Sequence, residues 1–179
     1  MRQAQDSALP HVLSKSWERK FADDLATEFE TYTCEKRSTI EEMRRFMAVK
    51  AYRELLLRMQ AARQGKESQE ALRSVAYAMR LYARERPALF AATFRTPTTD
   101  TPEWRGAVED LREFMVSILA ECGLRGNAAD QALRMLRCIV RGFVLHEVTD
   151  SVCDPTSYED SYESAICVFI AGLSGLVDP

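Results

Sequence analysis

The stretch AADQALRMLRCIVRGFVLHEVT, residues 128–149, decides the fold class of this chain. Its apolar residues recur every three to four positions, which is the period of an α-helix. One side carries Leu133, Leu136, Val140, Phe143 and Val144, and another side carries Met135, Ile139 and Leu145. We therefore expect a helix of about 22 residues, capped by Asn127, that a single neighbouring layer would not cover.

The final predicted helix, from Ser157 to about Leu176, has the same character, with almost no charge after Glu163. Two such helices are too apolar for the surface of a monomer, so part of this area is expected to contact a second copy of the chain. Burial within one copy is the alternative explanation. The residues expected at the interface are Leu133, Val140, Val144, Tyr162, Ile166, Phe169 and Leu173.

Two more helices are predicted upstream by their end signals. Ser38 to Glu41 fits a capping box before a long amphipathic helix, which Gln64-Gly65 ends. Ser68 is expected to cap the next helix, which ends at Arg86.

Prolines predict where the remaining two helices begin. Pro87 can begin a short helix that runs to Phe94, and residues 95–102, with two prolines and four threonines, form a loop. Thr101 then caps a helix to about Glu121 that Gly123 closes. The chain is thus predicted to be all-α, with about six helices after Ser38 and a less regular N-terminal segment.

The composition of the chain and the motifs that it lacks exclude several classes of function. The 179 residues have a net charge of −3, so any contact with nucleic acid needs a local patch. Five widely spaced cysteines and two histidines indicate neither a zinc site nor a disulfide framework. With no GxGxxG, P-loop or GxSxG motif, we expect no enzyme and no cofactor. No signal peptide or membrane span is predicted, which favours the cytoplasm and no membrane partner.

Two polar features have alternative interpretations. His146 and Asp150 lie four residues apart on one helical face, and a structural hydrogen bond is favoured there over a metal or acid–base site. Cys122 could be an accessible, redox-sensitive thiol, although nothing beside it would lower its pKa. The other cysteines are expected in the core.

Several segments resemble one protein family in order along the chain. They are EALR from Glu70, YARERPALF from Tyr82, RCIVRGFVLHE from Arg137, DSY from Asp160 and AGL from Ala171. Together they resemble the C-terminal ligand-binding and dimerisation domain of tetracycline-repressor (TetR) family transcription factors, over about residues 38–176. Arg141 stands where many members of the family have His.

The resemblance implies a TetR-like helical bundle that forms a homodimer through its last two helices. It also implies an inducer site between the central helices, for a hydrophobic or aromatic small molecule. Core packing is the alternative role for the residues implied at that site. They are Met79, Tyr82, Phe90, Phe94, Trp104, Phe114 and Phe143.

Residues 1–37 are expected to form a degenerate or shortened helix-turn-helix headpiece, with residues 38–179 as the TetR-like domain. By position, Phe21 to Leu25 would be the first helix of the motif, and Ala26-Thr27 the turn. The residues implied at DNA are Thr31, Tyr32, Lys36 and Arg37.

The charge of this headpiece leaves two functions open. Residues 1–37 contain six Lys or Arg and seven Asp or Glu, so their net charge is negative. DNA binding, by contrast, relies on cations that neutralise phosphates. The first hypothesis is a ligand-responsive homodimer that binds operator DNA. The alternative is a ligand-binding or protein-interaction module that has lost DNA binding and acts as an antirepressor or partner protein.

Overall fold

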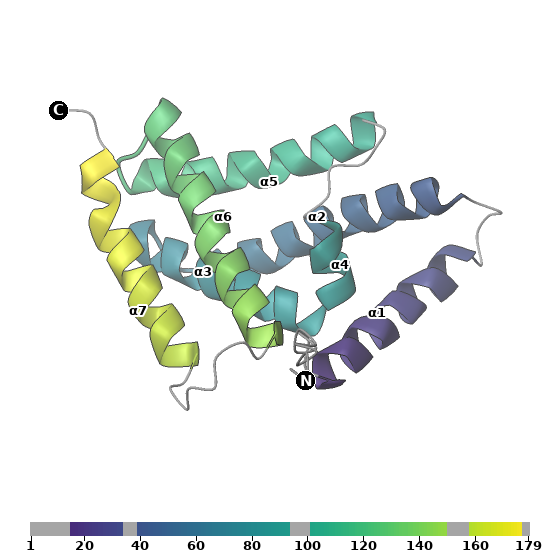
Figure 1. Ribbon diagram of the computed structural model, residues 1–179. Coiled ribbons are helices and arrows are strands. Elements are labelled where there is room, and N and C mark those ends of the chain that lie inside the picture. Colours follow the sequence, from purple (N-terminus) through teal and green to yellow (C-terminus); the bar gives the residue numbers. More distant parts are fainter. Residues whose placement is uncertain (1–14, 34–38, 94–100, 150–157, 177–179) are drawn as a thin grey trace, which may run out of the picture.

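The computed structural model describes residues 15–33, 39–93, 101–149 and 158–176, and within these it is helical without strands (Figure 1). The elements are α1 (Lys15–Thr33), α2 (Ile40–Arg63), α3 (Ser68–Glu85), α4 (Pro87–Ala92), α5 (Pro102–Glu121), α6 (Gly126–Thr149), α7 (Tyr158–Ala171) and the short 3₁₀ helix η1 (Gly172–Leu176). The all-α prediction is confirmed, and the described residues after Ser38 form six α-helices.

Several predicted helix ends are confirmed. Gly65, with φ of +72°, follows the end of α2 in a conformation that glycine adopts without strain. At the start of α5, the Thr101 hydroxyl accepts a 3.2 Å hydrogen bond from the Trp104 amide, and Pro102 occupies the first turn. Gly123, with φ of +89°, follows α5.

Three predicted caps are wrong. The capping box of α2 pairs Thr39 with Glu42, one residue later than expected, and the Thr39 amide donates to Oε2 of Glu42 at 2.9 Å. Ser68 is the first residue of α3, and its hydroxyl donates to the Glu121 carbonyl at 3.1 Å instead of capping. Asn127 lies inside α6, because that helix begins at Gly126.

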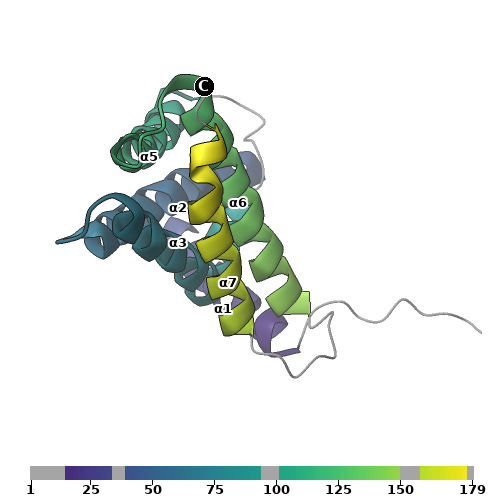
Figure 2. The same ribbon diagram turned by 90° about the vertical axis from the view of Figure 1, so that its left-hand side faces the viewer.

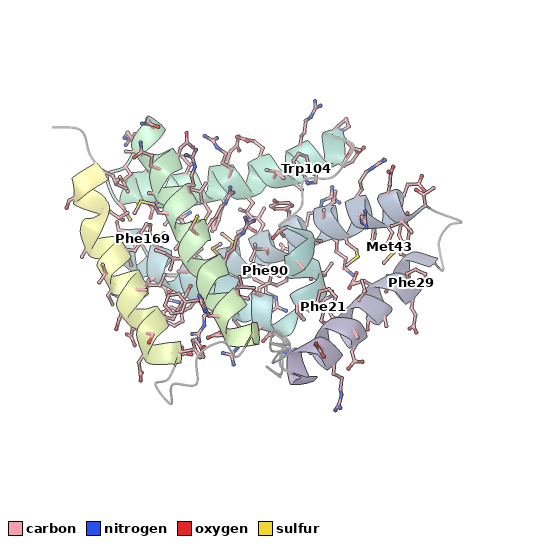
Figure 3. All side chains as sticks on the ribbon, in the orientation of Figure 1. Phe21, Phe29, Met43, Phe90, Trp104 and Phe169 are labelled. Carbon is pink, nitrogen blue, oxygen red and sulfur yellow. The ribbon has the colours of Figure 1, made fainter. Side chains whose placement is uncertain are left out.

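The helices enclose one hydrophobic core. α3 and α5 pack against α2, and α6 crosses them (Figure 1). α7 lies beside α6 in both views (Figures 1 and 2). Side chains fill the space between these helices, with Phe90 near the middle (Figure 3). The core therefore joins elements from α2 to η1 in one body.

A buried ion pair and a tyrosine join the C-terminal helices to α3. Arg80, which is 4% exposed, donates to Glu147 on α6 and, at 2.8 Å, to Glu159 on α7. The Arg80 guanidinium lies 4.7 Å from the centre of the Tyr162 ring, and the Tyr162 hydroxyl donates to the Ala76 carbonyl at 2.7 Å. These contacts determine how α6 and α7 sit on the bundle.

The N-terminal helix is more regular than expected. α1 runs unbroken from Lys15 to Thr33, so the predicted turn at Ala26-Thr27 is wrong. The Thr27 hydroxyl donates to the Asp23 carbonyl at 2.9 Å, as side chains within a helix often do. Phe21 packs against the core from this helix (Figure 3). Within residues 15–33, therefore, one helix stands where the first helix and turn of the motif were expected.

Candidate functional site

Most of the residues implied at the ligand site belong to the core. Met79, Tyr82 and Phe90 are at most 5% exposed, and Phe114 and Phe143 are partly buried against the same cluster. Trp104 is partly buried on α5, and Phe94 lies outside the described residues. The structure therefore brings five of the seven residues into one core, and their contact with a ligand stays a prediction.

Two of these residues carry polar atoms that have no hydrogen-bond partner. The Tyr82 hydroxyl and the Trp104 Nε1 are buried and lack an acceptor among the described residues. Burial, followed by the charge of Glu54, raises the pKa of Tyr82, so its hydroxyl stays protonated. A buried donor without an acceptor costs about 1–3 kcal/mol. Both atoms are thus places where a ligand oxygen would be stabilising.

A group of polar side chains between α2, α4 and α6 was not predicted. Arg141 Nη2 donates to the Thr93 carbonyl at 3.2 Å, and the Tyr52 hydroxyl lies 3.5 Å from the same oxygen. Arg137 lies one turn earlier on α6, where burial lowers its pKa and the charge of Tyr52 opposes that shift. The signal for this group was the run 131–146, which holds three arginines and no carboxylate.

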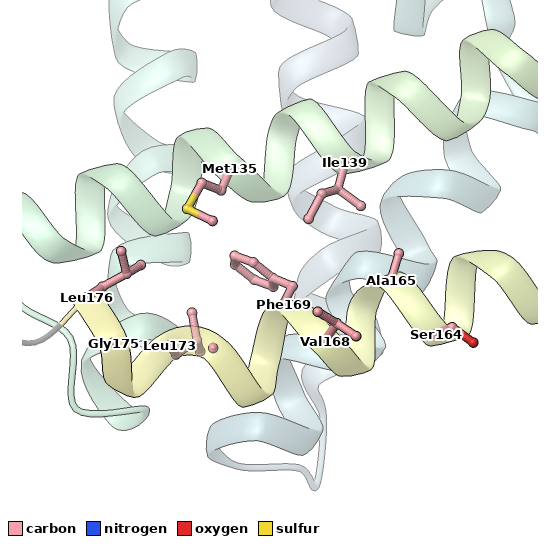
Figure 4. A pocket seen from close by; sticks show the side chains of 10 residues that line it. Met135, Ile139, Ser164, Ala165, Val168, Phe169, Leu173, Gly175 and Leu176 are labelled. Carbon is pink, nitrogen blue, oxygen red and sulfur yellow. The ribbon is translucent and has the colours of Figure 1, made fainter.

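The last two helices present an apolar groove on their outer side (Figure 4). It has a volume of about 630 Å³, and Met135 and Ile139 of α6 face Phe169 of α7 across it. Val168 is 73% exposed and Met135 is 47% exposed. The other lining residues are Ser164, Ala165, Gly172, Leu173, Gly175 and Leu176.

The residues predicted for the dimer interface lie mostly on the sides of α6 and α7 that face the core, away from the groove. All seven are at most 6% exposed within a single subunit, and they are Leu133, Val140, Val144, Tyr162, Ile166, Phe169 and Leu173. Only Phe169 and Leu173 also line the groove. Since both sides of α6 are apolar, periodicity did not distinguish the side that packs on α3 and α5 from the side that stays exposed. Contact of these seven residues with a second copy stays a prediction.

The structure describes two of the four residues that the family resemblance implies at the DNA contact. Thr31 is exposed in the last turns of α1, where its hydroxyl donates to the Thr27 carbonyl at 2.9 Å. The Tyr32 ring lies 5.1 Å from that of Phe46 on α2. Lys36 and Arg37 lie outside the described residues. Their role at DNA stays a prediction.

Ion pairs hold α1 against the body. Asp24 accepts a hydrogen bond from Arg86 Nε at 2.8 Å and another from the Ala88 amide at 2.9 Å. Glu28, which is 1% exposed, contacts Arg86 and accepts from Lys50 Nζ at 2.7 Å. The described part of the headpiece is therefore docked on α2 and the α3–α4 junction.

The three described cysteines are free thiols, and Cys34 and Cys153 lie outside the described residues. Cys122 is half-buried, and burial, followed by the charge of Glu121, raises the pKa of its thiol. Cys138 is exposed, so its expected place in the core is wrong, while Cys167 accepts from Arg73 at 3.0 Å. His146 is exposed, its carbonyl lies 3.4 Å from the Tyr158 hydroxyl, and Asp150 lies outside the described residues.

Two further properties of the described residues concern metal binding and membrane crossing. No group of three or more His, Cys, Asp or Glu is placed to hold a metal ion in those residues. None of the helices described is long and apolar enough to cross a membrane.

Comparison with known proteins identifies the family. Residues 72–169 match the family described as "Tetracyclin repressor-like, C-terminal domain". The chain is also 24% identical over 172 residues to a protein of Mycobacterium tuberculosis that is named an uncharacterized HTH-type transcriptional regulator, an alignment that covers 94% of this chain and 78% of that relative. The matched residues extend from α3 to α7 and contain most of the core described above. The chain therefore belongs to the tetracycline-repressor-like family of transcriptional regulators.

Proposed function

We propose that this regulator works as a homodimer in the cytoplasm, and that a small molecule bound in its helical body changes how the dimer engages operator DNA. The observation that carries the proposal is the exposed apolar groove on α6, α7 and η1 (Figure 4). Contiguous exposed apolar surface marks interaction sites in proteins that otherwise bury such side chains. The groove lies on the two helices that the family resemblance assigns to dimerisation.

A second copy of the chain suits this groove because a two-fold interface uses the same patch on both subunits. In such a pair, Val168 and Met135 would leave water in each copy. Leu145, 59% exposed on α6, would extend the apolar contact along the helix. Burying a side chain of this size contributes about 1.5–3 kcal/mol, so several of them on both copies are needed to offset the cost of association, about 4–15 kcal/mol.

The ligand part of the proposal rests on unsatisfied polar atoms within an aromatic core. The Tyr82 hydroxyl and the Trp104 Nε1 could each donate to a ligand oxygen, and Phe143 could offer apolar contact. A site with a few placed polar groups among aromatic side chains is typical for small molecules. Both residues are among those that the family resemblance implies.

DNA binding is tested directly with the DNA upstream of the gene for this chain. A dimer that binds operator DNA should retard this fragment and protect a palindromic footprint, because a two-fold dimer contacts two half-sites. Retardation should weaken steeply as salt increases. Absence of retardation, even at low salt, would contradict the operator-binding part of the proposal.

The docked α1 helix favours a second candidate function. In this case the chain keeps the ligand-binding and dimerisation body and acts as an antirepressor or as a partner of another regulator, without its own DNA contact. The supporting observation is that Asp24 and Glu28 fasten α1 to Arg86 and Lys50, with no turn between residues 15 and 33. Co-purification of a DNA-binding relative with this chain, together with no footprint for the chain alone, is the expected result.

A further inference from the structure

The middle of α6 carries positive charge that its own helix does not balance. Residues 131–146 include Arg134, Arg137 and Arg141 and no Asp or Glu. The nearest acidic residues on the helix are held by arginines of other elements. Asp130 accepts from Arg112 at 2.8 Å, and Glu147 accepts from Arg80 at 2.9 Å.

Of these three arginines, Arg137 is the one for which burial of the positive charge is unfavourable. It is partly buried, and burial is the largest influence that lowers its pKa, with the charges of Arg141 and Arg112 acting in the same direction. Like charges four residues apart on a helix destabilise it. Among the residues described, no carboxylate contacts Arg137, whereas Arg80, Arg86 and Arg112 each contact one. Buried cations normally have such a partner.

The surroundings of Arg137 are rich in donors and poor in acceptors. The Thr93 carbonyl, at the end of α4, already faces Arg141 and the Tyr52 hydroxyl. From the neighbouring helix α5, the charge of Arg112 also acts on Arg137, and this side chain has donors but no acceptor. Guanidinium and phenol groups that share a single carbonyl acceptor favour a ligand that brings oxygens without protons of its own.

We infer that Arg137 binds the carboxylate of a small organic acid with an apolar body, which makes the ligand of this protein an anion. One guanidinium that contacts no carboxylate among the residues described balances the single charge of a ligand carboxylate, and its fork of donors fits two carboxylate oxygens. Tyr52, whose charge acts on Arg137, is packed against the core and provides aromatic surface beside it. The inference rests on the proposal that the helical body binds a small molecule, and it specifies the chemical class.

The test measures binding of matched acids and amides to the full chain by calorimetry. The probes are benzoate and octanoate, the neutral benzamide and octanamide, and inorganic phosphate. The variant is Arg137→Gln, and the control is Arg134→Gln, which removes the same charge from an exposed position on α6. At least one carboxylate should bind the natural chain and the control, and Arg137→Gln should weaken this binding about 10- to 100-fold, as expected for a lost hydrogen bond to a charged group.

Stability without any probe separates a binding role from a structural one. Arg137→Gln removes an uncompensated, partly buried cation, so the variant should unfold at the same temperature as the natural chain or at a higher one. A marked fall in its unfolding temperature would overturn the inference, because Arg137 would then serve the fold. Binding of phosphate alone, or of no carboxylate, would also overturn it. Equal binding of an amide to the natural chain and Arg137→Gln would overturn it while leaving the proposed ligand-binding function intact.

Discussion

Arg86, between α3 and α4, donates a 2.8 Å hydrogen bond from Nε to Oδ1 of Asp24, and this pair fastens the N-terminal helix to the body. The same guanidinium donates from Nη1 to Glu54 at 2.9 Å and also contacts Glu28. One side chain thus joins α1 to α2 and to the α3–α4 junction. These ion pairs add to the apolar contact that Phe21 and Leu25 of α1 make with the core.

Replacement of Arg86 by Gln should release α1. The change leaves Asp24 and Glu28 largely buried without the guanidinium, a loss of about 3 kcal/mol if the pairs behave like other buried ion pairs. Limited proteolysis should then cut within α1 before the rest of the chain. Arg84→Gln, an exposed change on α3, is the control. Equal protection of α1 in the two variants would show that the ion pairs do not hold the helix.

Replacement of Arg80 by Gln should destabilise the whole bundle. Arg80 is 4% exposed and pairs with Glu147, whose other carboxylate oxygen is buried without a hydrogen bond among the described residues. Removing one partner of such a pair costs about 3–5 kcal/mol, because the other charge stays buried. Urea unfolding followed by circular dichroism measures the loss. A loss no larger than that of Arg84→Gln would mean that Glu147 escapes to solvent in the variant.

Tyr162→Phe tests the contact between α7 and α3 with a smaller change. The ring is fully buried, and its hydroxyl donates to the Ala76 carbonyl at 2.7 Å, so the variant should lose about 1 kcal/mol without losing packing. Tyr158→Phe, which removes a hydroxyl 3.4 Å from the His146 carbonyl near the surface, should change stability less. Thermal unfolding compares the two variants. The opposite order would place the stronger anchor of α7 at its N-terminal end.

The fold class and several helix ends were predictable because local rules determine them. Thr101-Pro102 and Cys122-Gly123 bound α5 as expected, since a cap, a proline and a glycine act on neighbouring residues. The start of α2 shifted by one residue because both Ser38-Glu41 and Thr39-Glu42 have the spacing of a capping box. Nothing in the local pattern distinguishes those two registers.

The candidate sites were harder to predict because they depend on contacts between helices. Leu133 and Met135 are both apolar, and only the packing of α6 on its neighbours decides that Leu133 is 4% exposed and Met135 is 47% exposed. Among the residues described, Arg137 likewise has no carboxylate contact because arginines of α3 and α5 pair with Glu147 and Asp130. Long-range pairing of this kind leaves no periodic signal.

Val168→Lys tests the predicted pairing face against a matched surface. Val168 is 73% exposed at the groove on α7, and Leu57 is 65% exposed on α2, away from the groove. A lysine at position 168 would place a charge in the proposed interface, where desolvation of an unpaired cation is unfavourable. Leu57→Lys introduces the same charge elsewhere and should leave the pairing unchanged. Circular dichroism would check that both variants stay folded.

The molecular mass in solution tests the dimer most directly. Sedimentation equilibrium should give twice the chain mass of 20.4 kDa for the natural protein and for Leu57→Lys. Val168→Lys should give a single-chain mass at the same concentration. A natural protein that sediments as a single chain, or a Val168→Lys variant that still pairs as tightly as Leu57→Lys, would contradict the proposal that the α6–α7 groove joins two copies.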